Sequence, residues 1–132
     1  CTYTDPEVAT VGLTELTATE QGIEYDITKY GIDDLDRAIA DSNDYGFVKV
    51  LTKKGSDKIL GATIVGASAG ELLTEFVTAM KFKKGLNSIL GTIHSYPTMS
   101  EANKFAAGIW KKNNAPEKLL IWVEKFHSWR RK

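Results

Sequence analysis

Three side chains of types that transfer protons or bind metals lie close together in the sequence. They are His94, Tyr96 and Glu101, in the segment His-Ser-Tyr-Pro-Thr-Met-Ser-Glu. Imidazole, phenol and carboxylate groups act as general acids and bases when a rigid element holds them near a substrate. We therefore take these three residues as the candidate catalytic residues.

Other interpretations of the same turn are weaker or purely structural. A metal site made from the three side chains would lack a fourth ligand nearby. A Ser-His-Asp arrangement is not indicated, because no glycine elbow surrounds Ser95 or Ser100. The simplest structural interpretation makes His94 a turn histidine bonded to backbone, Tyr96 a packing group and Glu101 a helix cap.

An amphipathic helix is expected to hold this turn in place. A short apolar run, residues 89–93, leads into the turn. Thr98 and Glu101 have the spacing of a capping box, in which the hydroxyl and the carboxylate each pair with a backbone N–H of the first turn. The helix is thus predicted to open at Thr98 and to stop before Pro116. Its predicted buried stripe consists of Ala102, Phe105, Ala106, Ile109 and Trp110.

Upstream of this helix the sequence predicts a β-hairpin. Residues 47–52 and 58–65 are rich in β-branched side chains and flank the loop Lys-Lys-Gly-Ser-Asp, whose composition is typical of a hairpin connection. Residues 2–13 alternate less regularly and predict a weaker strand that ends at a glycine.

A further strand is predicted over residues 23–30, where the hydrophobic period changes from that of a helix to that of a strand. Ile23, Tyr25 and Ile27 share one face of this strand. Two short helices are expected beside it, one from the N-cap Thr14 to Gly22 and one of one or two turns within residues 33–41.

A second long helix is predicted over residues 69–84. Ser68 and Glu71 form another capping box, and lysines followed by Gly85 are typical of a helix C-terminus. Its apolar stripe is Leu72, Leu73, Phe76, Val77 and Met80. A last helix is predicted from the spacing of Leu119, Trp122, Val123 and Phe126, followed by the basic end Trp129, Arg130, Arg131 and Lys132.

These elements predict one α+β domain over residues 1–132, an antiparallel sheet with helices packed on one side. A chain of 132 residues is long enough to bury a single core. The chain begins with Cys1 and not Met, and we expect it to be part of a longer polypeptide.

The composition narrows the class of protein. The 17 basic residues equal the 17 acidic ones, so no overall field favours nucleic acid or an anionic membrane. The apolar runs are far shorter than the roughly 18 residues of a spanning helix, and we expect a soluble, cytoplasmic protein. Cys1 is the single cysteine, which excludes an internal disulfide and a Cys-x-x-Cys redox pair.

The glycines at Gly61, Gly66 and Gly70 stand between a predicted strand and a predicted helix, where glycine loops can cradle phosphate. They match neither the dinucleotide-binding nor the P-loop pattern. Helix capping and close packing explain them more simply, and a ligand-binding module that uses the loop from Gly66 to Gly70 is the weakest of the functional hypotheses.

Several segments, taken in order, resemble the C-terminal dimerisation domain of the flavin-dependent pyridine nucleotide-disulfide oxidoreductases, the family of glutathione reductase, dihydrolipoamide dehydrogenase and mercuric reductase. Residues 4–13 (TDPEVATVGL) resemble the opening TDPE-x-A-x-VG, and residues 96–101 (YPTMSE) resemble its His-Pro-Thr-x-x-Glu segment. The intervening matches are residues 37–38, 46–49, 59–62 and 65–72.

The resemblance implies that this chain is the last third of a flavoenzyme. In the family, an FAD domain with a redox Cys-x4-Cys and an NAD(P) domain precede the dimerisation domain, and neither set of motifs is present here. The isolated chain is then expected to bind no cofactor, with FAD and NAD(P) bound in the full-length enzyme. Family members are homodimers in which the His of His-Pro-Thr reaches the partner's redox cysteines as acid and base, oriented by the Glu.

At that position this chain has Tyr96, and a phenol titrates near 10, far from the range of imidazole. His94 corresponds to the earlier His of the His-x-His-Pro form in the lipoamide branch. A tyrosine at this place resembles mercuric reductase, although the cysteine pair near the C-terminus of that enzyme is absent here.

The preferred hypothesis is therefore a homodimerisation domain of a mercuric-reductase-like or NAD(P)H:disulfide oxidoreductase. In it, Tyr96 would hydrogen-bond a thiolate or substrate in the partner subunit, with Glu101 beside it. The alternative is a stand-alone α+β domain that binds or converts a small ligand with His94, Tyr96 and Glu101.

Overall fold

The computed structural model describes residues 1–115 and Arg130. The predicted helix over residues 119–126 and the rest of the basic end lie outside the described residues.

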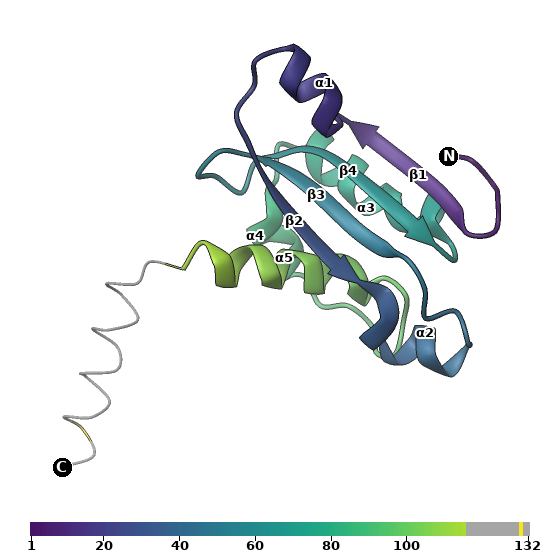
Figure 1. The fold of residues 1–132 in the computed structure, drawn as a ribbon. Coiled ribbons are helices and arrows are strands. Elements are labelled where there is room, and N and C mark those ends of the chain that lie inside the picture. The colour runs from purple at the N-terminus through teal and green to yellow at the C-terminus, as the bar shows by residue number, and fades with distance from the viewer. Residues whose placement is uncertain (116–129, 131–132) are drawn as a thin grey trace.

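A four-stranded antiparallel sheet forms the centre of the domain, with the strand order β1-β4-β3-β2 (Figure 1). The strands are β1 (Glu7–Gly12), β2 (Tyr25–Gly31), β3 (Phe47–Lys53) and β4 (Ile59–Gly66). The predicted hairpin is confirmed, since β3 pairs with β4 and Lys53 N donates to Lys58 O at 2.9 Å across the connecting loop. The strands predicted over residues 2–13 and 23–30 are confirmed as well. They correspond to β1 and β2, and each is shorter than predicted.

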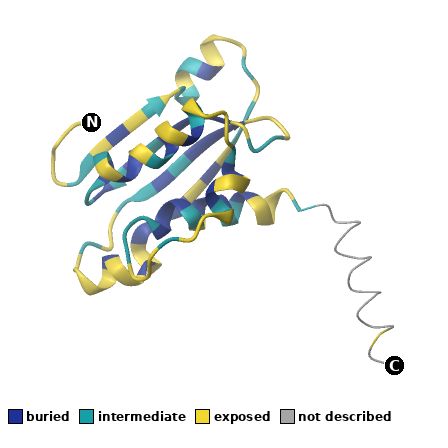
Figure 2. Ribbon diagram, turned by 180° about the vertical axis from the view of Figure 1, so that it is seen from behind, coloured by how far each residue is buried: buried dark blue, intermediate teal, exposed yellow. Residues whose placement is uncertain are grey.

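Two long helices cover one face of this sheet, as Figures 1 and 2 show. Helix α3 (Ala69–Lys81) lies against β1 and β4, and α5 (Glu101–Asn113) lies against β2 and β3. The strand residues facing them, among them Val48, Val50 and Ile64, are buried. The predicted class, an α+β domain with helices on one side of an antiparallel sheet, is confirmed.

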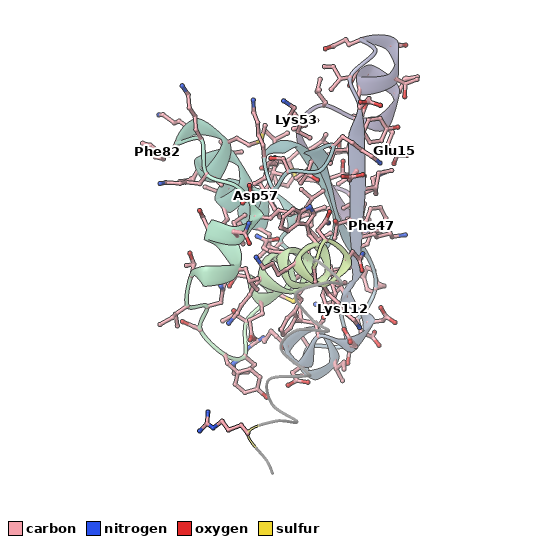
Figure 3. All side chains as sticks on the ribbon, turned by 90° about the vertical axis from the view of Figure 1, so that its left-hand side faces the viewer. Glu15, Phe47, Lys53, Asp57, Phe82 and Lys112 are labelled. Carbon is pink, nitrogen blue, oxygen red and sulfur yellow. The ribbon has the colours of Figure 1, made fainter. Side chains whose placement is uncertain are left out.

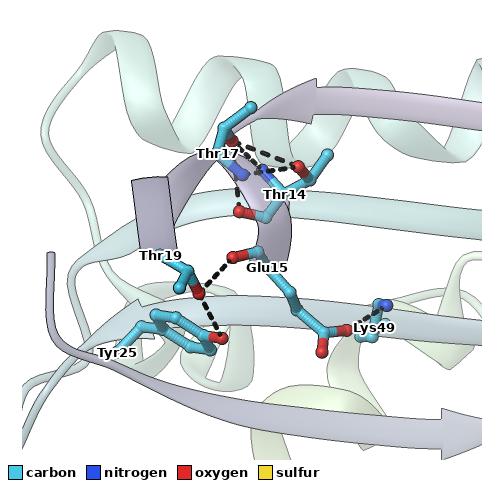
Figure 4. A network of polar contacts seen from close by, with 6 residues as sticks. All are labelled: Thr14, Glu15, Thr17, Thr19, Tyr25 and Lys49. Carbon is cyan, nitrogen blue, oxygen red and sulfur yellow. Dashed lines mark hydrogen bonds and ion pairs between the residues drawn. The ribbon is translucent and has the colours of Figure 1, made fainter. Parts of the chain in front are cut away.

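Among the described helices, only α1 (Glu15–Glu20) lies on the opposite face of the sheet, at one end (Figure 1). Thr14 caps this helix as predicted, in a capping box with Thr17 (Figure 4). The Glu15 carboxylate pairs with the Lys49 ammonium and thereby ties α1 to β3. Beyond α1 the described residues leave this face open, and Ile27 on β2 is 45% exposed. The apolar face predicted for this strand is therefore the open one, whereas Thr28 and Tyr30 on the other face are buried.

The capping box predicted for α3 is wrong. Ser68 has a left-handed backbone, with φ of 58°, and its side chain makes no capping bond. The first turn of α3 is capped instead by Glu7 on β1, whose Oε2 accepts a hydrogen bond from Gly70 N at 3.1 Å. Sequence spacing along the helix could not reveal a cap that comes from β1.

The C-terminal end of α3 also differs from its prediction. The helix ends at Lys81 and not at residue 84, because Lys83 takes a left-handed backbone with φ of 55°. Gly85 then begins a separate helix, α4 (Leu86–Gly91), that the sequence did not predict. A Cβ at Gly85 would lie 2.4 Å from carboxylate atoms of Asp57, so only glycine fits there. Helix α4 has only six residues, too few to show a helical hydrophobic period in the sequence, and no capping side chain marks its start.

The short helical segment predicted within residues 33–41 is confirmed. It consists of a 3-10 turn, η1 (Ile32–Asp34), and the five-residue helix α2 (Asp36–Ala40). Within the described part of the chain, no helix is both long and apolar enough to cross a membrane.

The core beneath α3 gives a direct test of the fold. Phe76 is fully buried, whereas the adjacent Val77 is 41% exposed. We expect Phe76→Ala to lower the free energy of unfolding by about 3–5 kcal/mol in a urea titration, because it leaves a cavity. Val77→Ala, the matched control on the same helix, should change it by less than about 0.5 kcal/mol. Equal effects of the two substitutions would contradict this placement of α3.

Candidate functional site

The turn of residues 92–100, hereafter the Tyr96 turn, joins α4 to α5 and carries the three candidate catalytic residues. Tyr96 itself is 71% exposed, but it is not free to move. Its hydroxyl donates a hydrogen bond to Asp36 Oδ2 at 2.7 Å, and Asp36 is the first residue of α2. The peptide bond to Pro97 is cis. An exposed aromatic ring is thus anchored at its outer end.

The charge of Asp36 acts on the chemistry of this phenol. The hydrogen bond to Asp36 raises the pKa of Tyr96 above its usual value, and the negative charges of Asp36 and, to a smaller extent, Glu101 act in the same direction. Tyr96 therefore keeps its proton throughout the neutral range. This arrangement suits a hydrogen-bonding group and not a proton carrier at neutral pH.

Glu101 serves the backbone of the turn. It is the first residue of α5, is buried, and accepts a hydrogen bond from Thr98 N at 3.2 Å through Oε2. Only this half of the predicted capping box exists. Thr98 Oγ1 instead donates to Ser95 O at 2.6 Å and contacts Ser100 Oγ at 2.8 Å. The helix accordingly begins at Glu101 and not at Thr98, a correction to the predicted start.

His94 points to the other side of the turn, toward α3. Its side chain is 5% exposed, and its Nε2 lies 2.9 Å from Glu75 Oε1. Its Nδ1 lies 3.1 Å from Thr92 O. The second oxygen of Glu75 accepts from Asn103 Nδ2 on α5 at 2.9 Å. His94 therefore joins the turn to α3, and Glu75 in turn links α3 to α5.

The structure thus brings the three predicted residues onto one turn but not into one cluster. Tyr96 bonds to α2, His94 to α3, and Glu101 to the turn itself, and no hydrogen bond joins any two of the three within the described residues. No group of three or more His, Cys, Asp or Glu in the same part of the chain is arranged to hold a metal ion.

A cleft of about 680 Å³ opens beside Tyr96, between the β2–α2 segment and α5. Asp36 and Glu101 lie at its walls, and Lys112 also lines it, on the last turn of α5 (Figure 3). A second tyrosine-aspartate pair contributes to the cleft, since Tyr30 donates to Asp34 Oδ1 at 2.6 Å. Burial first, and then this hydrogen bond and the charge of Asp34, raise the pKa of Tyr30.

Sequence reasoning missed both aspartates of these pairs. Asp34 and Asp36 belong to a short acidic run, Asp-Asp-Leu-Asp, that leads into α2 and has the appearance of a solvated turn. Their partners lie four and 60 positions away in the chain, so the longer pairing follows only from the fold.

The glycine loop before α3 does not fit a phosphate. The carboxylate of Glu7 already occupies the helix N-terminus and accepts from Gly70 N. A bound phosphate would have to displace this acid or lie against its negative charge. Close packing explains the glycines, because a Cβ at Gly70 would lie 3.1 Å from Cys1 Sγ and one at Gly61, within β4, would lie 2.0 Å from Leu13 O.

An antiparallel sheet with helices on one face, and the Tyr96 turn before α5, agree with the class of domain that the motifs suggested. The family model described as "Pyridine nucleotide-disulphide oxidoreductase, dimerisation domain" matches residues 1–107. The chain belongs to this family, and it is a dimerisation domain of enzymes such as dihydrolipoyl dehydrogenase.

Curated relatives agree with this assignment. The chain is 46% identical over 105 residues to the mitochondrial dihydrolipoyl dehydrogenase of Dictyostelium discoideum, a match that covers 80% of this chain and 22% of that protein. It is 44% identical over 105 residues to leghemoglobin reductase of Glycine max, covering 80% and 20%. The chain spans about a fifth of the length of these relatives.

Solved structures show the same fold at lower identity. LpdA from Mycobacterium tuberculosis superposes with a TM-score of 0.74 at 24% identity, covering 80% of this chain and 23% of that one. The Cu(II) complex of the HOCl-induced flavoprotein disulfide reductase RclA from Escherichia coli gives 0.75 at 21%, covering 80% and 24%.

The contact between His94 and Glu75 predicts a structural role for His94. Replacing His94 by Ala leaves the half-buried Glu75 carboxylate without this partner, and we expect a loss of about 1.5–3 kcal/mol in the free energy of unfolding. A double-mutant cycle with Glu75→Ala, which removes the acceptor that a glutamine would keep, measures the coupling by urea denaturation. Strictly additive effects of the two substitutions would refute the contact.

Proposed function

We propose that this chain forms the homodimer of a longer FAD- and NAD(P)-dependent disulfide or mercuric-reductase-like oxidoreductase, and that Tyr96 enters the active site of the partner subunit. One observation carries the proposal: Tyr96 is 71% exposed and yet held by a hydrogen bond to Asp36. A large aromatic side chain fixed in an exposed position is ready to meet another molecule without further loss of rotamer freedom.

In that position Tyr96 supplies a hydrogen-bonding group to the partner's thiols or substrate. Tyr96 stands at the position where the family resemblance predicts a histidine. It does not transfer protons as that histidine does, because the pKa of Tyr96 is raised. Glu101 contributes by fixing the turn through Thr98 N. FAD and NAD(P) belong, on this proposal, to upstream domains of the same polypeptide and supply the hydride chemistry there.

The alternative of a stand-alone site built from His94, Tyr96 and Glu101 has less support. The side chain of His94 is 5% exposed and bonds to Glu75 on the other side of the turn. A substrate at Tyr96 would therefore not meet the imidazole. A contribution to a composite site requires only Tyr96 to be accessible.

The Tyr96→Phe variant of the full-length enzyme tests the composite site. We expect turnover to fall by about tenfold or more, the factor that corresponds to one hydrogen bond to a charged or reacting group. Steady-state kinetics measure the effect. Two controls accompany it: sedimentation shows whether the variant is dimeric, and the flavin absorbance spectrum shows whether it contains FAD. Unchanged kcat and KM would contradict the proposed contribution of Tyr96 to the partner's active site.

The dimer itself can be tested at a neighbouring position. Ile93 is 94% exposed in the same turn, whereas Leu16 is 68% exposed on α1, on the opposite face of the sheet. If the Tyr96 turn enters the partner, Ile93→Asp should weaken dimerisation of the full-length protein by about tenfold or more, because a charge becomes buried there. Leu16→Asp is the matched control. Analytical ultracentrifugation showing equal dissociation constants for both variants would argue against this interface.

A further inference from the structure

Asp36 is the only described residue that holds the side chain of Tyr96 by a hydrogen bond, and it lies on α2, 60 positions upstream. Glu101, which the family resemblance would make the orienting acid, is engaged elsewhere. Its Oε2 accepts from Thr98 N, and the residue is 8% exposed at the start of α5. The acid that orients the side chain at this position therefore comes from a different element.

The direction of this hydrogen bond has a chemical consequence. A phenol has a single proton, and at 2.7 Å from a carboxylate the hydroxyl of Tyr96 donates that proton to Asp36. The lone pairs of the phenol oxygen remain available on the exposed side. While the pair is intact, Tyr96 can accept a hydrogen bond from an incoming group but cannot donate one to it.

We propose that Asp36 is the positioning residue of Tyr96 and fixes its hydroxyl as a hydrogen-bond acceptor, so that the group it meets brings its own proton or a positive charge. This inference rests on the function proposed above and deepens it. The group facing Tyr96 is then a protonated thiol, or an N–H or O–H of the substrate, and not a bare thiolate.

The surroundings of the pair favour such a ligand. Asp34, Asp36 and Glu101 line the cleft beside Tyr96, so a thiolate would approach three carboxylates. Lys104, three positions after Glu101, and Lys112, on the last turn of α5, also line the cleft. The lining as a whole therefore has three carboxylates and two ammonium groups, and its net charge is negative.

The first test measures the pair directly in the full 132-residue chain, labelled with ¹³C at the ring carbon that bears the tyrosine hydroxyl. In an NMR titration, Asp36→Asn should lower the pKa of Tyr96 toward its ordinary value near 10. Asp34→Asn is the matched control, which should lower the pKa of Tyr30 and leave that of Tyr96 in place. A Tyr96 pKa that does not respond to Asp36→Asn would overturn the proposal.

The second test measures turnover of the full-length enzyme in a double-mutant cycle. Asp36→Ala should slow turnover by about three- to tenfold when Tyr96 is present and have no further effect in Tyr96→Phe, while Asp36→Glu restores part of the rate. Asp41→Asn, on the residue that follows α2, is the charge control and should leave turnover unchanged.

The outcomes of this cycle separate the two proposals. If Tyr96→Phe slows turnover and Asp36→Ala does not, Asp36 has no positioning role and the proposed function stands. If the effects of the two substitutions multiply, Asp36 acts independently of Tyr96 and the positioning role is refuted. If neither variant slows turnover, the proposed function fails, and the positioning role fails with it.

Discussion

Three carboxylates, from α2, α3 and α5, hold the Tyr96 turn against the body of the domain. Asp36 of α2 accepts from the Tyr96 hydroxyl, Glu75 of α3 faces the His94 imidazole, and Glu101 of α5 accepts from Thr98 N. The turn contains no regular structure of its own, so these side-chain bonds replace the backbone ladder that would otherwise fix it. The rest of the site depends on this fixation.

These bonds can hold the Tyr96 turn because the sheet determines the positions of the helices that supply the carboxylates. Helix α3 packs on β1 and β4, and α5 packs on β2 and β3, so their N-terminal and middle turns lie at fixed places on one face. Fully buried Phe76 and Ala106 anchor the two helices in a common core. A turn tied to both helices inherits their rigidity. Tyr96 is left 71% exposed, as the proposed contribution to a partner's active site requires.

The sequence was sufficient for features set by local pattern. The β-rich residues 47–52 and 58–65 and the loop between them were enough to predict the hairpin, and Thr14 was recognised as the cap of a short helix that ends before Gly22. Features that depend on distant contacts were missed. The N-terminus of α3 is capped by Glu7 on β1, and Asp36 reaches Tyr96 across 60 positions. Periodicity contains no information about either pairing.

The central claim is that the Tyr96 turn is rigid before any partner arrives. Backbone ¹⁵N relaxation of the 132-residue chain measures this directly at the amides of His94, Ser95 and Tyr96, with the middle of α5 as the internal reference. We predict order parameters of about 0.85 in the turn, equal to those of the helix. Values below about 0.6 at these amides would show a flexible turn and contradict the account.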